Sequence, residues 1–206
     1  MDRKAKPTIS PGKRERTRDR IALAGIALFQ TQGFEATTME QIASAADVVR
    51  GTLYNHFPVK DAIVVHWLHG QLDQALEPLM QDAMRRPTFL ARAATLLEAS
   101  ATWWEENRVF ATPYVRHRFH EFRENQGDAP TSAMIPAYER LIRAGQASGE
   151  LATAMPAERL ACYLHFLTLC ALIDWIASPK TPLPAMFADA LEFFMEGARA
   201  RQESRR

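Results

Sequence analysis

The stretch from Thr37 to Lys60 holds the side chains best suited to recognise another molecule. Its candidate contact residues are Thr38, Arg50, Thr52, Tyr54, Asn55, His56 and Lys60. An arginine fork matches the O6 and N7 acceptors of guanine, and hydroxyl and amide groups hydrogen bond to bases or phosphates. We therefore predict that Arg50 contacts a guanine and that Thr52 and Asn55 contact bases or phosphates. The other four are predicted to contact the backbone of double-stranded DNA and so to position the protein on it.

Two short helices joined by a turn should present these side chains. Thr37 and Thr38 can each cap the first helix, because Glu40 and Gln41 follow three residues later, at the capping-box spacing. A turn at Asp47-Val48 should lead to a second helix that begins near Val49 or Arg50. Leu53 and Phe57 lie four residues apart, so they should face inward while the polar residues stay outside. The pattern predicts a helix-turn-helix.

This segment resembles the DNA-binding domain of TetR-type transcriptional regulators. The matching residues are Gly33, Phe34, Thr37, Thr38, Ile42, Ala43, Ala46, Val48, Gly51-Thr52-Leu53-Tyr54, His56-Phe57 and Lys60. The resemblance implies a homodimeric repressor that occupies a palindromic operator. It also implies that a small-molecule effector bound in a helical body changes the separation of the two heads and releases the DNA.

Two residues depart from the family pattern. Asp47 stands in the turn where the family usually has glycine, and it tolerates a left-handed backbone better than most other residues. Val49 stands where the family usually has Ser or Thr, and it cannot accept a hydrogen bond from the first turn of the second helix. The missing cap should cost on the order of 1 kcal/mol.

Charge is distributed unevenly along the 206 residues. Residues 1–60 carry ten Lys or Arg and six Asp or Glu, although the net charge of the chain is only +1. A basic N-terminal part suits a polyanionic partner. No uninterrupted apolar run approaches the roughly 20 residues that a membrane span needs, and the N-terminus lacks a signal-like apolar core. A cytoplasmic protein is predicted, with Cys162 and Cys170 as reduced thiols.

Helical periodicity dominates, and no alternating strand pattern is present, so an all-α fold is predicted. We expect a flexible basic arm at residues 1–12, a three-helix DNA-binding domain at 13–60, and a helical effector-binding and dimerisation domain at 61–206. The helices are expected at Lys13–Gln32, in the helix-turn-helix, at Lys60–Met84 with a kink near Pro78, at Thr88–Asn107, at Phe110–Asn125 with an interruption near Pro113, at Thr131–Ser148, at Pro156–Ser178 and at Ala185–Arg201.

Aromatic residues of the body could line an apolar cavity for an apolar or aromatic effector. The predicted effector residues are Trp103, Phe110, Tyr114, His117, Phe119, Tyr138 and Phe166, with Phe122, Arg116 and His120 as further candidates. Aromatic residues at helical spacing also form ordinary cores, so the kind of site is better indicated than its members.

The last two helices carry more apolar surface than one small core needs. The predicted dimer-interface residues are Leu164, Leu167, Ala171, Trp175, Leu191 and Phe194. In the resembled family the last helices form a four-helix bundle across the dimer axis. These residues could also simply close the core of one subunit.

No pattern for catalysis, cofactor binding or metal binding emerges. The sequence has no glycine-rich phosphate loop and no G-x-S-x-G elbow, and the pairs His66/His69 and His117/His120 lack further ligands at zinc spacing. Two alternatives remain. One is a helical small-molecule-binding protein or enzyme that no longer binds DNA, and the other is an effector-free DNA-organising protein.

Overall fold

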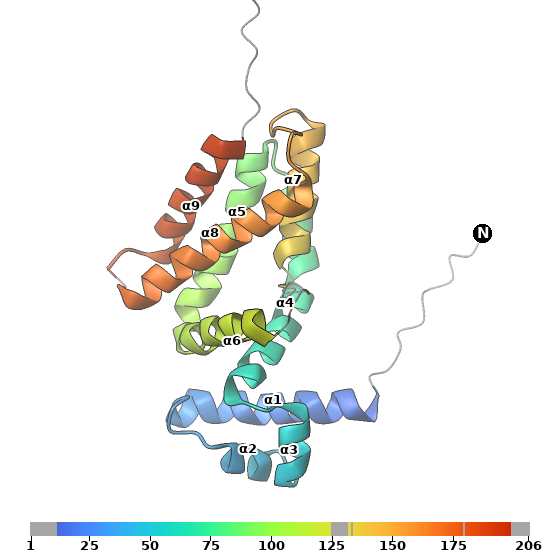
Figure 1. Cartoon of the computed structure of the whole chain (residues 1–206), viewed down its shortest axis with the longest axis vertical. Helices are drawn as coiled ribbons and strands as arrows, with labels where there is room; N and C mark the ends of the chain where they lie inside the picture. The colour runs from blue at the N-terminus through green and yellow to red at the C-terminus, as the bar shows by residue number, and fades with distance from the viewer. Residues whose placement is uncertain (1–11, 125–131, 133, 179, 199–206) are drawn as a thin grey trace, which may run out of the picture. The chain divides into compact units, whose positions relative to one another are not determined.

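The computed structural model describes residues 12–124, 132, 134–178 and 180–198. In these residues the chain is built from α-helices with one short 3-10 helix and no strand, so the all-α prediction is confirmed (Figure 1). The chain divides into two compact units, Met1–Trp67 and Leu68–Arg206. We call them the head and the body. The predicted basic arm lies outside the described residues except for Gly12.

The head packs its helices around one apolar core. It contains α1 (Lys13–Gln32), α2 (Met39–Ala45), α3 (Arg50–His56) and the first two turns of α4 (Lys60–Met84), and α2 contacts both α1 and α3. The buried side chains of the core include Ile21, Phe29, Ile42, Leu53 and Phe57. Leu53 and Phe57 face inward as predicted, which leaves the opposite side of α3 for polar contacts.

One of the two threonines before α2 is its cap. The Oγ1 atom of Thr38 accepts a hydrogen bond from the backbone N–H of Gln41 at 3.2 Å, and the Gln41 side chain accepts from the backbone N–H of Thr38 at 2.8 Å. Thr37 is buried and donates its hydroxyl to the Gly33 carbonyl at 2.8 Å. The capping box therefore belongs to Thr38, while Thr37 fastens the loop between α1 and α2.

The turn between α2 and α3 has the backbone that the sequence suggested. Asp47 has a φ of 50°, in the left-handed region that favours glycine. Val49 is the N-cap residue of α3 and makes no capping hydrogen bond with its side chain. Its side chain is 72% exposed. Both departures from the family pattern therefore destabilise the head, Asp47 through backbone strain and Val49 through an uncapped helix.

The boundary between the units falls later than the sequence indicated. We expected the head to end at residue 60, but the division lies between Trp67 and Leu68, inside α4. The reason is that Ile63 and Val64 are fully buried in the head. A methyl group added at Gly25 of α1 would lie 2.9 Å from Cγ2 of Ile63, so the absence of a side chain at Gly25 permits this close packing.

The body is a helical bundle in which α8 is central. It contains the rest of α4, α5 (Phe89–Glu106), η1 (Arg108–Phe110), α6 (Ala111–Glu124), α7 (Met134–Ala147), α8 (Ala157–Ala177) and α9 (Leu183–Ala198). Helix α8 contacts α6, α7 and α9, and α5 contacts α7 and α9. This arrangement brings five helices to the neighbourhood of α8, where a cavity can form.

Several helix limits differ from the predictions in ways that proline explains. Helix α6 begins at Ala111 with Pro113 in its first turn, where the missing N–H has no intrahelical acceptor to lose. Helix α4 continues through Pro78, whose ring is exposed. Helix α9 begins at Leu183, two residues before the predicted start, with Pro184 in its first turn. Two of these prolines therefore lie in the first turns of helices, and the third lies at an exposed position inside a continuous helix.

Among the described residues, α8 is the one helix long and apolar enough to cross a membrane, with a mean hydropathy of 1.8. It packs between α7 and α9 and contributes Leu160, Leu164 and Leu172 to the buried core. The central helix of a soluble bundle has this same composition, so length and hydropathy are weak evidence for a span.

Candidate DNA-binding surface and effector cavity

The outward side of α3 presents a compact set of polar side chains. Thr52, Asn55 and His56 lie three and four residues apart, so they share one face, and together with Arg14 of α1 they line a shallow notch. Tyr54 is 38% exposed, and Arg50 and Asn55 are exposed as well. The structure thus brings together the predicted contact residues of α3 and adds Arg14, which the sequence reading had not singled out.

Arg50 is held in place by its neighbours. Its guanidinium lies 3.1 Å from the Glu40 carboxylate and stacks over the Tyr54 ring at 5.4 Å. The Arg50 and Glu40 side chains are 68% and 54% exposed, so the ion pair is weak and Arg50 can exchange Glu40 for another anion. To reach a guanine, Arg50 must leave Glu40, whose negative charge would also repel a phosphate.

His56 sits in a positive environment at the end of α3. Partial burial, and then the positive charges of Arg14 and Arg18, lower the pKa of His56 below its ordinary value of 6.5. The imidazole is therefore neutral at pH 7. A neutral imidazole can still accept or donate one hydrogen bond to a nearby group, and an adjacent phosphate would favour its protonation.

Lys60 has a structural position that differs from its predicted one. Its ammonium donates hydrogen bonds to the carbonyl oxygens of Phe34 and Thr37, each at 2.8 Å, and lies 4.6 Å from the centre of the Phe34 ring. We expected it to contact the DNA backbone. These hydrogen bonds tie α4 to the loop before α2. Because the Lys60 ammonium already donates to two carbonyl oxygens, it is not among the DNA contacts that we propose.

A cavity in the body is lined by residues of α4, α5, α6, α7, α8 and α9, and it measures about 170 Å³. Of the predicted effector residues, Trp103, Tyr114 and Tyr138 line it. The Trp104 ring lies 5.0 Å from each of the Trp103 and Tyr114 rings, which makes one aromatic cluster. Leucines of α4 and α8 complete an apolar lining that excludes water from most of the wall.

Four predicted effector residues lie elsewhere. Phe110 is fully buried in the core away from the cavity lining, and His117 is not among the lining residues. Phe119 is 52% exposed on α6, and Phe166 is 38% exposed on the outward side of α8. The sequence showed that these residues are aromatic but not which way each helix turns them. The side chain of Phe122 lies outside the described residues.

Two polar residues of the cavity wall, His165 and Thr168, were not predicted from the sequence, whereas Tyr138 beside them was. Tyr138 is fully buried and forms a side-chain hydrogen bond with Thr168. The Thr168 hydroxyl in turn donates to the backbone carbonyl of His165 at 2.9 Å. Burial raises the pKa of Tyr138 far above its ordinary value, so the phenol stays protonated. The signal that could have found this wall is the pair His165 and Thr168, three residues apart on an otherwise apolar helix.

His165 is the titratable group of this cavity. Burial, and then the positive charge of Arg118, lower the pKa of His165 to about 4. Its side chain is therefore neutral at pH 7. Among the described residues, no group forms a hydrogen bond with its buried Nε2 atom. A buried polar atom without a partner is costly, so the cavity offers one unused hydrogen-bonding position.

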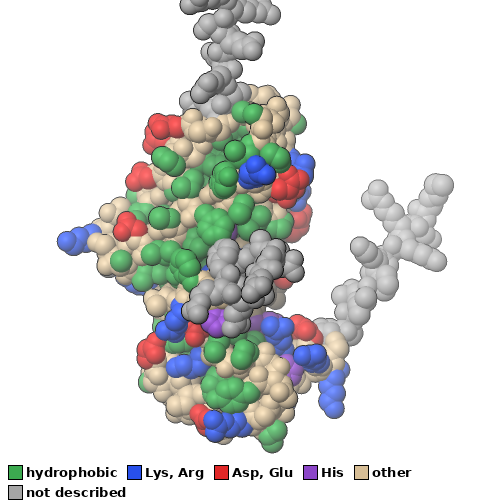
Figure 2. Space-filling model, in the orientation of Figure 1, with side chains coloured by type: hydrophobic (Ala, Val, Ile, Leu, Met, Phe, Trp, Pro, Cys, Tyr) green, Lys and Arg blue, Asp and Glu red, His purple; other side chains and the backbone are tan. Residues whose placement is uncertain are grey.

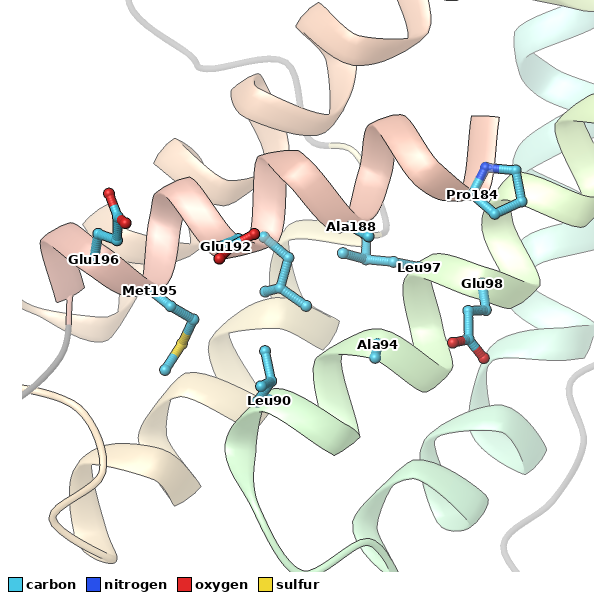
Figure 3. A pocket seen from close by; sticks show the side chains of 10 residues that line it. Leu90, Ala94, Leu97, Glu98, Pro184, Ala188, Glu192, Met195 and Glu196 are labelled. Carbon is cyan, nitrogen blue, oxygen red and sulfur yellow. The ribbon is translucent and has the colours of Figure 1, made fainter. Parts of the chain in front are cut away.

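A wider groove between α5 and α9 has a different character. It measures about 420 Å³, and its side chains extend from the two helices toward the space between them (Figure 3). The floor is apolar, with Leu90, Ala94 and Leu97, but the polar rim is Glu98, Glu192 and Glu196, which are all exposed to solvent. This groove lacks a buried polar group that would orient a ligand, so we do not treat it as the effector site.

The outward side of α8 and α9 is unusually apolar. Hydrophobic side chains spread over the body on the face shown in Figure 2. On α8 and α9, Tyr163, Phe166 and Phe193 are 49%, 38% and 68% exposed. A shallow groove between these side chains includes Leu167 and Gly197. An apolar surface of this kind commonly marks a protein contact.

The predicted dimer residues fall into two groups. Leu164, Trp175 and Leu191 are buried within the subunit, and Phe194 is 5% exposed, at the bottom of the outward groove. Leu167 and Ala171 are half-buried on the outward side. Four of the six predicted residues therefore belong to the core of one subunit, because both faces of α8 are apolar and the periodicity does not distinguish them.

One further cluster contains groups that can ligate metals. Glu15, Asp19 and His66 place their ligand atoms within 4.8 Å of one another in the head. Nε2 of His66 and Oδ1 of Asp19 are already 2.8 Å apart, as in a hydrogen bond between α1 and α4. This contact accounts for the proximity of the groups without a metal ion.

The head matches a known protein family. Residues 21–66 match the family model described as bacterial regulatory proteins of the tetR family. The HTH-type transcriptional regulator TcmR of Streptomyces glaucescens is 39% identical over 59 residues, which are 29% of this chain and 26% of that protein. The chain covers only 26%, 37% and 30% of the lengths of the first three curated relatives. The family-model match therefore lies within the head.

Solved structures resemble the chain over nearly its whole length. The structure of Thermus thermophilus FadR, a TetR-family transcriptional repressor in complex with lauroyl-CoA, has a TM-score of 0.76 at 21% identity and covers 92% of this chain and 98% of its own. The structure of RolR in complex with resorcinol has a TM-score of 0.61 at 19% identity and covers 92% of this chain and 90% of its own. At these identities the likeness establishes the fold of the body.

Proposed function

We propose that this chain, whose residues 21–66 match the tetR family of bacterial regulatory proteins, is a cytoplasmic, homodimeric transcriptional repressor that binds a palindromic operator and is released by a small-molecule effector. The observation that carries the proposal is the polar face of α3, on which Arg50 and Asn55 are exposed and Thr52 is half-buried, a set of side chains that suits a major groove once Arg50 leaves Glu40. The relatives named above are regulators, which favours this function over an enzyme.

In this proposal the contact residues are Thr38, Arg50, Thr52, Tyr54, Asn55, His56 and, in addition, Arg14. Thr38 keeps its hydroxyl hydrogen available for a phosphate, because capping uses the oxygen as an acceptor. The uncapped N-terminus of α3 has free backbone N–H groups that suit a phosphate oxygen. A single head contacts few base pairs, so two heads on adjacent half-sites are needed for tight binding.

We place the effector in the cavity lined by Trp103, Tyr114 and Tyr138. Proteins of this fold bind small molecules, as the lauroyl-CoA and resorcinol complexes illustrate. Helix α4 lines the cavity through Leu68 and Leu72 and begins in the head, so a ligand that moves α4 can act on both units. A differential affinity of about 1–3 kcal/mol between two conformations is enough for a useful switch.

Fluorescence anisotropy tests the proposal. The purified protein is titrated into labelled duplex from the DNA beside its own gene, over a salt series, with an unrelated duplex of equal length as competitor. We expect preference for the former duplex at every salt concentration, and affinity that falls steeply as salt increases. Arg50→Ala should reduce the preference by roughly tenfold or more, since a bidentate base contact contributes about 1–3 kcal/mol.

The matched control is Arg85→Ala, which removes an exposed arginine of the body instead. It should leave operator affinity unchanged. Equal binding of both duplexes, or equal loss in the two variants, would contradict a sequence-reading role for α3.

A further inference from the structure

We propose that the effector is a compact, single-ring aromatic molecule with a hydroxyl group that hydrogen bonds to Nε2 of His165. The inference rests on the proposed function, since it names the ligand class of the proposed effector cavity. Three features of the cavity support it, namely its size, its aromatic wall and the buried Nε2 atom of His165, which has no hydrogen-bond partner among the described residues.

The size of the cavity limits the ligand. A volume of about 170 Å³ is close to that of an engineered apolar cavity of about 150 Å³ that accommodates benzene. Drug-sized ligands occupy pockets of roughly 300–1,000 Å³, so a long acyl chain does not fit this cavity as it stands. One six-membered ring with one or two small substituents does.

The aromatic wall suits a planar ring. Trp103 and Trp104 are nearly perpendicular to each other, with an angle of 85° between their planes, and Tyr114 packs beside Trp104 at 49°. Offset and edge-to-face arrangements of this kind are the ones that aromatic rings prefer. A ligand ring in the cavity can meet both a ring face and a ring edge.

Polar complementarity selects the hydroxyl group. Tyr138 and Thr168 use each other and a backbone carbonyl, whereas Nε2 of His165 has no hydrogen-bond partner among the described residues and is 95% buried with its side chain. A neutral imidazole nitrogen is a donor in one tautomer and an acceptor in the other. A hydroxyl group can serve either tautomer, whereas a carbonyl serves one.

Charge argues against an acidic ligand in this position. No Asp, Glu, Lys or Arg side chain is among the residues that line the described part of the cavity. A carboxylate would lose its hydration there without a charged partner in contact, which is costly. Arg118 lies near His165 without lining the cavity, and its positive charge favours an electron-rich oxygen at that end of the ring.

Isothermal titration calorimetry of the full chain at pH 7 tests the proposal with three probes. Phenol carries the hydroxyl, toluene has the same shape with a methyl group instead, and dodecanoate carries a long chain and a carboxylate. We expect phenol to bind at least roughly tenfold more tightly than toluene, because toluene leaves Nε2 of His165 without a partner. Dodecanoate should bind more weakly than phenol.

Two variants at one position separate recognition from folding. His165→Leu removes the hydrogen-bonding group, so phenol should lose its advantage over toluene, and His165→Gln should keep part of it because an amide both donates and accepts. Circular dichroism verifies the helical content of each variant. If His165→Leu does not fold, the comparison of probes on the unmodified protein still decides.

Equal or tighter binding of toluene would overturn the role of His165, and tighter binding of dodecanoate would overturn the compact class of ligand. Absence of heat with all three probes would overturn the site itself. None of these results affects DNA binding, which anisotropy measures without a ligand. A protein that prefers its operator but rejects phenol would therefore contradict this inference and leave the repressor proposal intact.

Discussion

Val49 stands at the start of α3, where a side-chain acceptor would normally satisfy the first backbone N–H groups. Its apolar side chain is exposed and makes no such bond. We expect Val49→Ser to raise the free energy of unfolding by about 1 kcal/mol, because serine supplies the missing cap. Urea titration followed by circular dichroism measures the change. Val109→Ser, at another exposed valine, is the control and should give no gain.

Glu40 competes with DNA for the guanidinium of Arg50. The ion pair is exposed, so breaking it costs little, but its carboxylate also repels phosphates. We expect Glu40→Gln to tighten operator binding roughly threefold at low salt, with the gain disappearing at high salt. Anisotropy titrations measure it beside Glu192→Gln, an exposed glutamate of the body. An unchanged affinity in Glu40→Gln would show that the pair does not limit Arg50.

His165 should make the stability of the body depend on pH. Its pKa is about 4 in the folded chain and near the ordinary 6.5 when unfolded. Below pH 6.5 the unfolded state therefore binds more protons, and the stability contributed by the neutral imidazole is lost as the pH falls from about 6.5 to about 4.

Unfolding by urea at pH 7 and pH 5 measures this loss. Between pH 7 and pH 5, the free energy of unfolding should fall by roughly 2 kcal/mol less in His165→Leu than in the unmodified chain. His120→Leu, at an exposed histidine, is the control and should follow the unmodified chain. Identical pH dependence in all three proteins would mean that His165 is already charged or solvated when folded.

Residue types predicted the exposed polar face of α3 better than the lining of the cavity. The outward position of Arg50, Thr52 and Asn55 follows from the spacing of Leu53 and Phe57 alone, because a short helix has only one inward side. The polar cavity wall depends on how α7 and α8 are rotated against each other. That rotation is set by packing among several helices, and no local pattern in the sequence encodes it.

At the scale of helices, the close contact of α1 with α4 depends on Gly25. A side chain there would meet Ile63 at 2.9 Å. We expect Gly25→Ala to destabilise the head by about 1–2 kcal/mol, because overpacking outweighs the better helix propensity of alanine. Thermal unfolding measures the effect.

Gly70 provides the matched control for this substitution. It lies in α4 with no atom within 4 Å of an added methyl group. Gly70→Ala should therefore stabilise the chain by up to about 1 kcal/mol. Stabilisation by both substitutions would indicate that helix propensity, rather than the contact with Ile63, controls the result.

Helix positions could largely be read from the sequence, whereas their functional faces could not. The apolar stripe of a helix such as α1 points to one core, so its packing follows from periodicity. Helix α8 is apolar almost all round, and the same pattern is compatible with a core face, a cavity wall and a subunit interface. The structure places Leu164 in the core, His165 at the cavity and Phe166 on the outer surface.

At the scale of the whole molecule, the proposed repressor needs two heads at a fixed distance. The outward face of α8 and α9 carries the exposed side chains of Tyr163, Phe166 and Phe193. Monomeric proteins rarely leave such a cluster of aromatic side chains exposed to solvent. A second copy of the chain would bury them in a closed two-fold contact.

We expect Phe193→Asp to give a monomer, because two carboxylates would then be buried near the two-fold axis without partners. Light scattering coupled to size-exclusion chromatography measures the mass, and anisotropy measures the loss of operator affinity that follows when only one half-site is held. Phe119→Asp places the same charge on another exposed phenylalanine, in α6, and should remain dimeric. If Phe193→Asp remains a dimer of unchanged stability, α8 and α9 do not form the interface. If it is a monomer that binds the operator with full affinity, paired heads are not needed.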